Sequence, residues 1–214
     1  MENPIVANAL DFVKKTFESD FSGHDYFHTL RVFKTASRIA AEENADLLTV
    51  QLAALLHDVD DIKLSPETHE SKANAVQFLR ANHVEEDFIR TICCIIDEIS
   101  FSGNGSTVPQ TLEGKCVQDA DRLDAIGAIG IARTFAYGGS HHRPIHDPAI
   151  PPKLNMTKEE YRNHKATSIN HFYEKLFLLK DLMNTPSAKQ IALRRESFMH
   201  SFMKQFMEEW DGVR

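Results

Sequence analysis

The chain has 214 residues, and 24 Lys and Arg against 31 Asp and Glu give a formal net charge of −7. Its 42% hydrophobic and 26% charged content excludes a collagen-like, low-complexity or largely disordered chain. The acidic balance argues against a nucleic acid polymer as partner, although a small phosphorylated ligand needs only a few local cations. No apolar run approaches the roughly 18 residues that cross a bilayer, and no secretory signal is evident. We therefore expect a cytoplasmic protein that does not bind membranes.

Helical periodicity dominates the chain. In chain order, we expect helices over residues 4–17, 25–43, 46–58, 66–82, 85–100, 112–136, 157–183 and 187–210. No alternating stretch predicts a strand. The fold class is therefore all-α, a helical bundle in a single domain over 1–214.

Three of these helices carry specific expectations. The helix over 46–58 is uniformly apolar and should be buried at the centre. Pro66 is suited to the first turn of the helix over 66–82. The helix over 112–136 should be interrupted or closely packed around Gly127 and Gly130, and Gly138-Gly139 should end it.

Two segments are predicted loops. Residues 101–109, rich in Gly, Asn and Ser, form the first. Residues 138–156 form the second, with four prolines, three histidines and an arginine. A loop of this length is uncommon in a compact domain unless it is functional or disordered, so a substrate-facing lid and a mobile excursion both stay open.

The three cysteines contain no C-x-x-C pair and give neither a disulfide framework nor a thiolate zinc site. We expect Cys93, Cys94 and Cys116 to be buried thiols in a reducing compartment.

Four short strings concentrate the reactive side chains. In the first, GHDYFHTLRV, His24 and His28 lie four residues apart, and Arg31 shares their helix face. In the second, LLHDVDDIK, His57 and Asp58 end a very apolar helix, where both are costly to bury without strong partners.

The third and fourth strings lie further along the chain. QDADRLDAIGAIG carries Asp119, Asp121 and Asp124 within an otherwise apolar helix. NHFYEKL places His171 and Lys175 four residues apart.

A set of two imidazoles and two carboxylates suits one divalent transition metal. Mn²⁺ is favoured, and Fe²⁺, Co²⁺, Ni²⁺, Zn²⁺ or Mg²⁺ are alternatives. Such a set is neutral with a divalent ion and leaves coordination positions open. A bound ion of this kind lowers the pKa of water toward about 7 and so generates hydroxide at neutral pH.

These strings resemble the HD-domain superfamily of metal-dependent phosphohydrolases, closest to its small single-domain bacterial branch. The family pattern H…HD…D maps onto His28, His57, Asp58 and Asp121. The strings DADRLDAIGAIGIARTF and HFYEKL match the same branch, so the resemblance covers about residues 20–210. It implies an all-α bundle with a central metal site. The core would span about 20–136 and the C-terminal helices about 157–210.

Departures from other branches refine this interpretation. A GYP string and extra histidines for a second metal are missing from the sequence, which argues against a dinuclear site. Alarmone hydrolases carry an Asn four residues after the last Asp ligand. Here that position is Ala125, which argues against an alarmone substrate. An acid three residues beyond the HD aspartate serves catalysis in related branches, and here that residue is Asp61, our candidate general base or water-orienting group. Asp60 is the less favoured neighbour, and its simpler interpretation is a surface acid at a helix end.

Cations near these strings are candidates for binding phosphate. Lys63 comes first, Arg31 and Arg122 follow, and surface salt bridges are the simpler interpretation of each. His24 could face the substrate or support His28, and Lys175 with His171 rests on the family-like string alone. Arg143 and the His141-His142 pair would contribute if the loop closes over the substrate.

The resemblance implies hydrolysis of nucleoside or deoxynucleoside triphosphates to monophosphate and pyrophosphate, by attack of metal-bound hydroxide. A nucleotide phosphomonoesterase (5′-nucleotidase-like) is the alternative of the same class. A non-catalytic metal or nucleotide sensor and a purely structural helical module are alternatives of other classes. The base, the sugar and a homodimeric assembly stay open.

Overall fold

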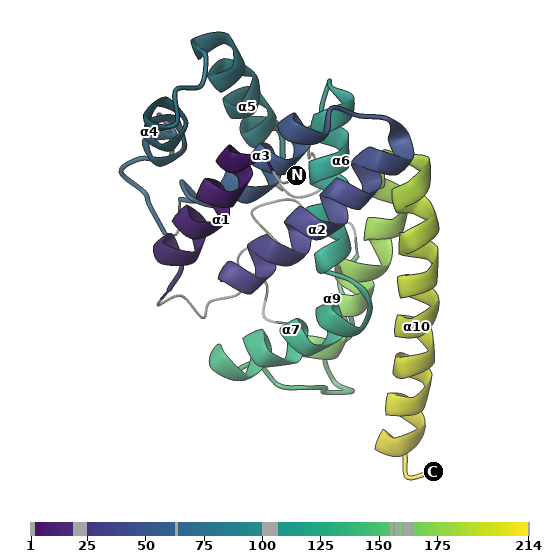
Figure 1. Ribbon diagram of the computed structural model, residues 1–214. Coiled ribbons are helices and arrows are strands. Elements are labelled where there is room, and N and C mark those ends of the chain that lie inside the picture. Colours follow the sequence, from purple (N-terminus) through teal and green to yellow (C-terminus); the bar gives the residue numbers. More distant parts are fainter. Residues whose placement is uncertain are drawn as a thin grey trace. The chain divides into compact units, whose positions relative to one another are not determined.

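The structure is a computed structural model that describes residues 3–18, 25–62, 64–99, 107–154, 156, 160, 164 and 166–213 (Figure 1). Helices, turns and loops account for all of these residues, so the described chain is all-α, as predicted. It divides into two compact units. Unit 1 comprises Met1–Phe101 and Ser106–Ala120, and unit 2 comprises Ser102–Gly105 and Asp121–Arg214. The single domain over 1–214 stays a prediction.

Unit 1 is built around α3, which contacts helices on several sides. Its helices are α1 (Pro4–Thr16), α2 (Tyr26–Glu43), α3 (Leu47–Leu56), α4 (Ala73–Ala81), α5 (Glu86–Ile99) and the first part of α6 (Leu112–Asp124). Leu52, Leu55 and Leu56 of α3 are fully buried. The Asp46 carboxylate begins α3 by accepting from the Thr49 amide at 2.8 Å. The uniformly apolar segment is therefore the central helix of its unit, as its composition predicted.

The helix predicted over 66–82 is shorter in the structure. Residues 66–72 form turns, in which the Thr68 and His69 amides both donate to the Ser65 carbonyl. The helix begins only at Ala73, because Lys72 before it has a left-handed backbone with φ 50°. Pro66 therefore lies in a turn and does not begin the helix.

Unit 2 has an aromatic core along its longest helix. Its elements are the end of α6, α7 (Gly127–Ser140), α9 (Ser168–Glu174), the 3-10 helix η2 (Leu176–Leu182) and α10 (Pro186–Trp210). Phe202 of α10 has its ring centroid 5.9 Å from Phe135 of α7 and 6.0 Å from Phe172 of α9. Such ring pairs contribute packing energy beyond their buried area, so they hold the three helices together.

The predicted interruption near Gly127 is confirmed, but the predicted end at Gly138-Gly139 is wrong. α6 stops at Asp124, and α7 begins at Gly127, whose φ of 78° is in the left-handed region. α7 then runs through both later glycines to Ser140. A Cβ on Gly138 would lie 2.2 Å from the Ser168 hydroxyl oxygen, so this glycine allows a close approach within unit 2.

The continuous helix predicted over 157–183 is wrong for the described residues. Thr167 begins α9 by accepting from the Asn170 amide at 3.0 Å. At Lys175 the backbone leaves the helical region, with φ −143° and ψ −56°, and the chain continues as η2. A β-region cap and one distorted residue thus replace the single helix with two short ones.

The proline-rich segment is attached to α9. Its Pro144 and Ile145 carbonyls accept from the Ser168 and Ile169 amides at 2.9 and 3.0 Å. Further along, the Ile150 carbonyl accepts from the Asn170 side chain at 2.8 Å. The described part, 141–154, is therefore tied to α9 along its length, against the interpretation as a loose excursion; its role as a lid stays a prediction.

The cysteines differ in exposure, which corrects the expectation of three buried thiols. Cys94 is exposed, Cys93 is half-buried and Cys116 is fully buried. Burial, together with the nearby carboxylate of Asp119, raises the pKa of the Cys116 thiol to about 12. No helix of the described chain has the length and apolarity needed to cross a membrane.

Candidate metal centre

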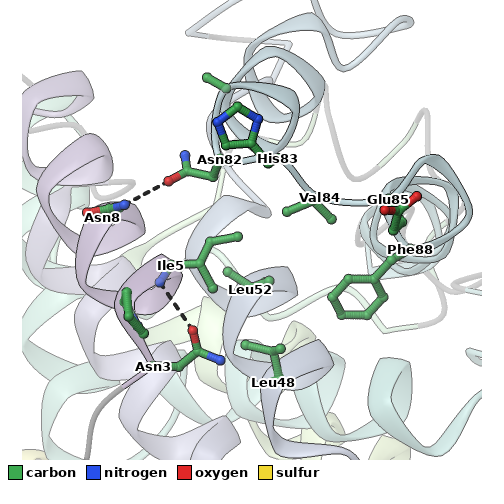
Figure 2. A pocket seen from close by; sticks show the side chains of 12 residues that line it. Asn3, Ile5, Asn8, Leu48, Leu52, Asn82, His83, Val84, Glu85 and Phe88 are labelled. Atoms are coloured by element: carbon green, nitrogen blue, oxygen red, sulfur yellow. Dashed lines mark hydrogen bonds between the residues drawn. The ribbon is translucent and has the colours of Figure 1, made fainter.

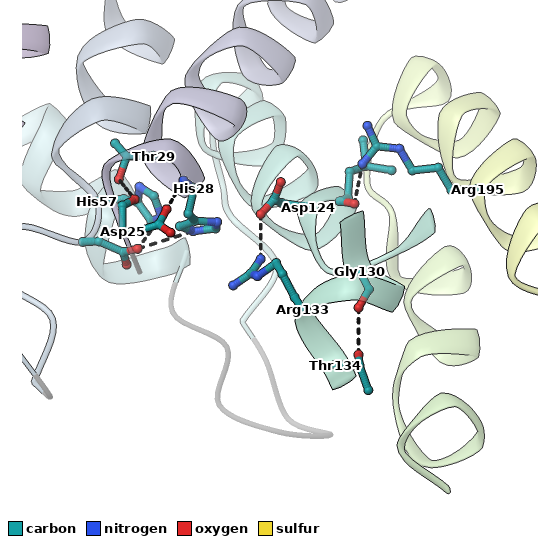
Figure 3. A network of polar contacts seen from close by, with 11 residues as sticks. Asp25, His28, Thr29, His57, Asp124, Gly130, Arg133, Thr134 and Arg195 are labelled. Atoms are coloured by element: carbon teal, nitrogen blue, oxygen red, sulfur yellow. Dashed lines mark hydrogen bonds and ion pairs between the residues drawn. The ribbon is translucent and has the colours of Figure 1, made fainter. Parts of the chain in front are cut away.

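The first ligand candidate, His28, is placed by the start of α2. Asp25 precedes this helix in an extended conformation, and its carboxylate accepts from the His28 amide at 2.7 Å (Figure 3). This bond satisfies one of the backbone donors that a helix start leaves without a partner. The cap therefore fixes the backbone of His28, and its side chain is buried, with 2% exposure.

The second and third candidates lie at the end of α3. His57 is the residue at which this helix ends, and Asp58 follows it in a turn. The Asp58 Oδ2 atom lies 3.2 Å from His57 Nε2 and 3.4 Å from His28 Nε2. His28, His57 and Asp58 thus bring two ring nitrogens and a carboxylate oxygen together within 4.8 Å of one another.

This spacing fits a divalent transition metal. Ligand atoms about 2.1 Å from one ion lie about 3.0 Å apart at right angles and about 3.4 Å apart at the tetrahedral angle. The separations of Asp58 Oδ2 from the two imidazole nitrogens, 3.2 and 3.4 Å, lie within this range.

The tautomer of His57 also fits. Its Nδ1 lies 2.9 Å from the Ala54 carbonyl oxygen. A carbonyl can only accept, so Nδ1 carries a proton and donates it. In the neutral ring, Nε2 then presents a lone pair toward the negative Asp58 carboxylate. A ring lone pair and a carboxylate oxygen at this distance can bind one metal ion together.

The turn that carries these ligands is held by Asp60, His69 and Asn74. None of the three was predicted to have this role. The Asp60 carboxylate accepts from the Asn74 and Ala75 amides at 3.1 and 3.0 Å. Its carbonyl oxygen lies 2.8 Å from His69 Nδ1. Asp60 is therefore a buried cap of α4, not a surface acid. No pattern in the sequence marks this pairing, because the partners are 9 to 15 residues apart.

The other candidates of unit 1 are only partly placed. Asp61 is half-buried in the turn after Asp58, and its amide donates to the Asp58 carbonyl at 3.0 Å. Arg31 is half-buried on α2, three residues after His28. His24 and Lys63 lie outside the described residues. The catalytic role of Asp61 and the phosphate-binding roles stay predictions.

The remaining predicted ligand, Asp121, belongs to unit 2, together with Arg122. The Arg122 guanidinium donates to the Leu182 carbonyl of η2 and is buried, so it has a structural contact of its own. Asp124 pairs with Arg133 at 2.6 Å (Figure 3). The metal-binding role of Asp121 and the substrate-binding role of Arg122 stay predictions.

His171 lies in unit 2, where the charges of Lys175 and Arg143 act on it. Burial, together with the positive charges of Lys175 and Arg143, lowers the pKa of His171 to about 3. His171 is therefore neutral at physiological pH. The contribution of Lys175 to substrate binding stays a prediction.

A cavity of about 680 Å³ lies elsewhere in unit 1, between α1, α3 and the turn from α4 to α5 (Figure 2). Leu48, Leu52 and Phe88 contribute apolar walls, and Asn8 donates to Asn82 at 2.7 Å across the rim. None of the predicted site residues lines this cavity.

Comparison with known proteins identifies a matching family and similar structures. Residues 25–126 match the HD domain family. A crystal structure of an HD-superfamily hydrolase from Bacillus thuringiensis is 44% identical, covers 96% of each chain and has a TM-score of 0.78. The chain therefore belongs to the HD domain family of metal-dependent phosphohydrolases.

Two further relatives match nearly the whole chain. YpgQ of Bacillus subtilis is 35% identical over 204 residues, which cover 94% of this chain and 92% of YpgQ. YpgQ has been crystallised in complex with ADP, and that structure has a TM-score of 0.75. A protein from Lactobacillus plantarum is 43% identical, covers 99% of each chain and has a TM-score of 0.84.

Proposed function

We propose that the protein hydrolyses nucleoside or deoxynucleoside triphosphates to a monophosphate and pyrophosphate, using one divalent metal ion, Mn²⁺ in first place. The observation that carries the proposal is the cluster of His28, His57 and Asp58, in which the tautomer of His57 directs a lone pair toward the carboxylate. ADP bound to YpgQ supports a nucleotide as the ligand class.

His28, His57 and Asp58, with Asp121, would hold the ion. When bound, the ion lowers the pKa of water and polarises a phosphoryl oxygen. Asp61 would orient the attacking water and accept its proton. As the bond from the water oxygen to the α-phosphorus forms, the bond from that phosphorus to the bridging oxygen breaks and pyrophosphate leaves. Arg31, Lys63, Arg122, Lys175 and His24 are our candidates for neutralising the phosphates.

The test is a product assay on metal-stripped protein. We would incubate it with nucleoside mono-, di- and triphosphates in ¹⁸O-labelled water, with and without Mn²⁺, and resolve pyrophosphate from phosphate. The expected result is pyrophosphate from triphosphates, formed only with metal, with the ¹⁸O label in the monophosphate. A label in pyrophosphate would place the attack at the β-phosphorus and contradict the proposal.

Other products would support the alternatives. Phosphate released from monophosphates would identify a nucleotide phosphomonoesterase. Metal-dependent binding of nucleotides without turnover would identify a sensor. Absence of both metal binding and turnover would support the alternative of a purely structural helical module.

A further inference from the structure

The turn that carries His57 and Asp58 is tied to a segment 9 to 15 residues further along the chain. The Asn74 side-chain amide donates to the Val59 carbonyl at 3.1 Å, and the same nitrogen donates to the Thr68 hydroxyl at 3.1 Å. The His69 ring donates from Nδ1 to the Asp60 carbonyl at 2.8 Å. The two peptide carbonyls that follow Asp58 are therefore both held by side chains.

The same segment is fixed in return. The Asp60 carboxylate accepts from the first two available amides of α4, those of Asn74 and Ala75. Lys72, immediately before α4, is buried and forms an ion pair with Asp97 of α5. The donors of Asn74 and His69 thus project from a segment that is itself attached to a neighbouring helix.

The α4 amides donate to the Asp60 carboxylate, whereas the side chains of Asn74 and His69 donate to the carbonyls of the turn. The two sets of bonds have different consequences. Capping α4 requires only the Asp60 carboxylate, because a helix start leaves amide donors without partners. The bonds from Asn74 and His69 add nothing to that cap. They satisfy the buried carbonyls of Val59 and Asp60 and so hold the peptide planes next to a metal ligand.

We propose that Asn74 and His69 are positioning residues of the metal centre, which act by holding the peptide planes of residues 59 and 60. Without these two donors the turn gains rotational freedom, and the separations of 3.2 and 3.4 Å from Asp58 Oδ2 to the two imidazoles are no longer held. This inference rests on the metal centre of the proposed function and extends it to residues that do not touch the ion.

The experiment titrates metal-stripped protein with Mn²⁺ alone by isothermal titration calorimetry. Asn74→Ala and His69→Leu each remove one donor, and we expect the dissociation constant for Mn²⁺ to rise about tenfold in each, the lower end for residues that orient metal ligands. His69→Asn should restore affinity close to wild type, because the asparagine amide nitrogen occupies the place of Nδ1.

Asn82→Ala is the matched control. Asn82 also donates from its side chain to a carbonyl, that of Phe78 at 2.9 Å, but does so at the opposite end of α4. It should therefore leave the Mn²⁺ affinity unchanged, even if it lowers the melting temperature.

A purely structural role gives a different result. Asn74→Ala and His69→Leu would then lower the melting temperature of the apo protein, while the folded variants bind Mn²⁺ with wild-type affinity, and the inference is overturned. Wild-type protein that binds neither Mn²⁺ nor any of the alternative divalent ions overturns both this inference and the proposed function, whereas wild-type binding of Mn²⁺ with unchanged variants overturns this inference alone. Circular dichroism establishes folding, and His69→Leu carries the test if Asn74→Ala does not fold.

Discussion

His57 donates from Nδ1 to the carbonyl oxygen of Ala54, so its other nitrogen approaches Asp58 at 3.2 Å as an acceptor. The Ala54 carbonyl belongs to the last turn of α3, where carbonyls lack partners within the helix. One bond thus completes the end of the helix and orients the imidazole.

Asp58→Asn tests this arrangement at the scale of one residue. The amide nitrogen of asparagine can donate to His57 Nε2, so the apo variant should melt at or above the wild-type temperature. Binding stabilises wild type by about 2.7 kcal/mol when the metal is at 100 times its dissociation constant. Because the variant lacks the negative ligand, Mn²⁺ should raise the melting temperature of wild type and not of the variant.

The readout is differential scanning fluorimetry with and without Mn²⁺, together with hydrolysis of triphosphates. His57→Ala serves as a second variant, and it should also lose metal binding while keeping its helical circular dichroism. Equal Mn²⁺ stabilisation of wild type and Asp58→Asn would exclude Asp58 as a ligand.

At the scale of elements, the break between α6 and α7 depends on one left-handed residue. Gly127 has φ 78°, and a Cβ there would lie 3.0 Å from the Cγ of Arg195. The Arg195 guanidinium in turn donates to the Leu123 carbonyl at the end of α6. Burial lowers the pKa of Arg195, an effect that the charge of Asp124 partly offsets. The break is therefore built from a backbone conformation and a buried cation together.

Gly127→Ala should lower the free energy of unfolding by at least about 1–2 kcal/mol, the cost of a left-handed conformation for a residue with a Cβ. Gly139→Ala is the matched control. Gly139 lies in α7 without positive φ, and a Cβ there meets nothing within 4 Å. This control should gain about 0.5–1 kcal/mol, because alanine loses less backbone entropy in a helix. Urea denaturation measures both, and equal effects would contradict the assignment of Gly127.

At the scale of the whole molecule, the stability of the chain depends on the protonation of His171. Its pKa is about 3 in the folded protein against 6.5 as the ordinary value, chiefly because of burial. Between these values the unfolded chain binds a proton that the folded chain does not. The free energy of unfolding should therefore fall as the pH decreases from 6.5 toward 3, and this contribution is fully present above 6.5.

His171→Gln should make this loss of stability with acid less steep, by at most about 1.4 kcal/mol per pH unit. The measurement is urea denaturation of both proteins at intervals between pH 7 and pH 4. Because other groups titrate in both proteins alike, the difference between the two slopes isolates His171. Parallel pH dependences would show that His171 takes up its proton equally in both states.

Much of the fold follows from local patterns. The periodicity of α2 and α10 and the uniform apolarity of α3 predict elements whose observed bounds differ by only a few residues. The predicted helix ends were wrong where a residue type suits two different local structures. Gly138 suits both a helix end and a close helix contact, and the structure has the contact. Pro66 suits both a helix start and a turn, and the structure has the turn.

The sequence by itself determined the helical class, because helical periodicity depends on residue type and spacing, and its resemblance to the HD-domain superfamily predicted His28, His57 and Asp58 as ligands. Tertiary structure alone decided that Asp60 caps a helix 14 residues away, that Asn74 and His69 hold the metal-bearing turn, and that Ala54 selects the tautomer of His57. These roles depend on which donors and acceptors folding brings within about 3 Å of each other, and residue type and spacing along the chain do not specify that distance.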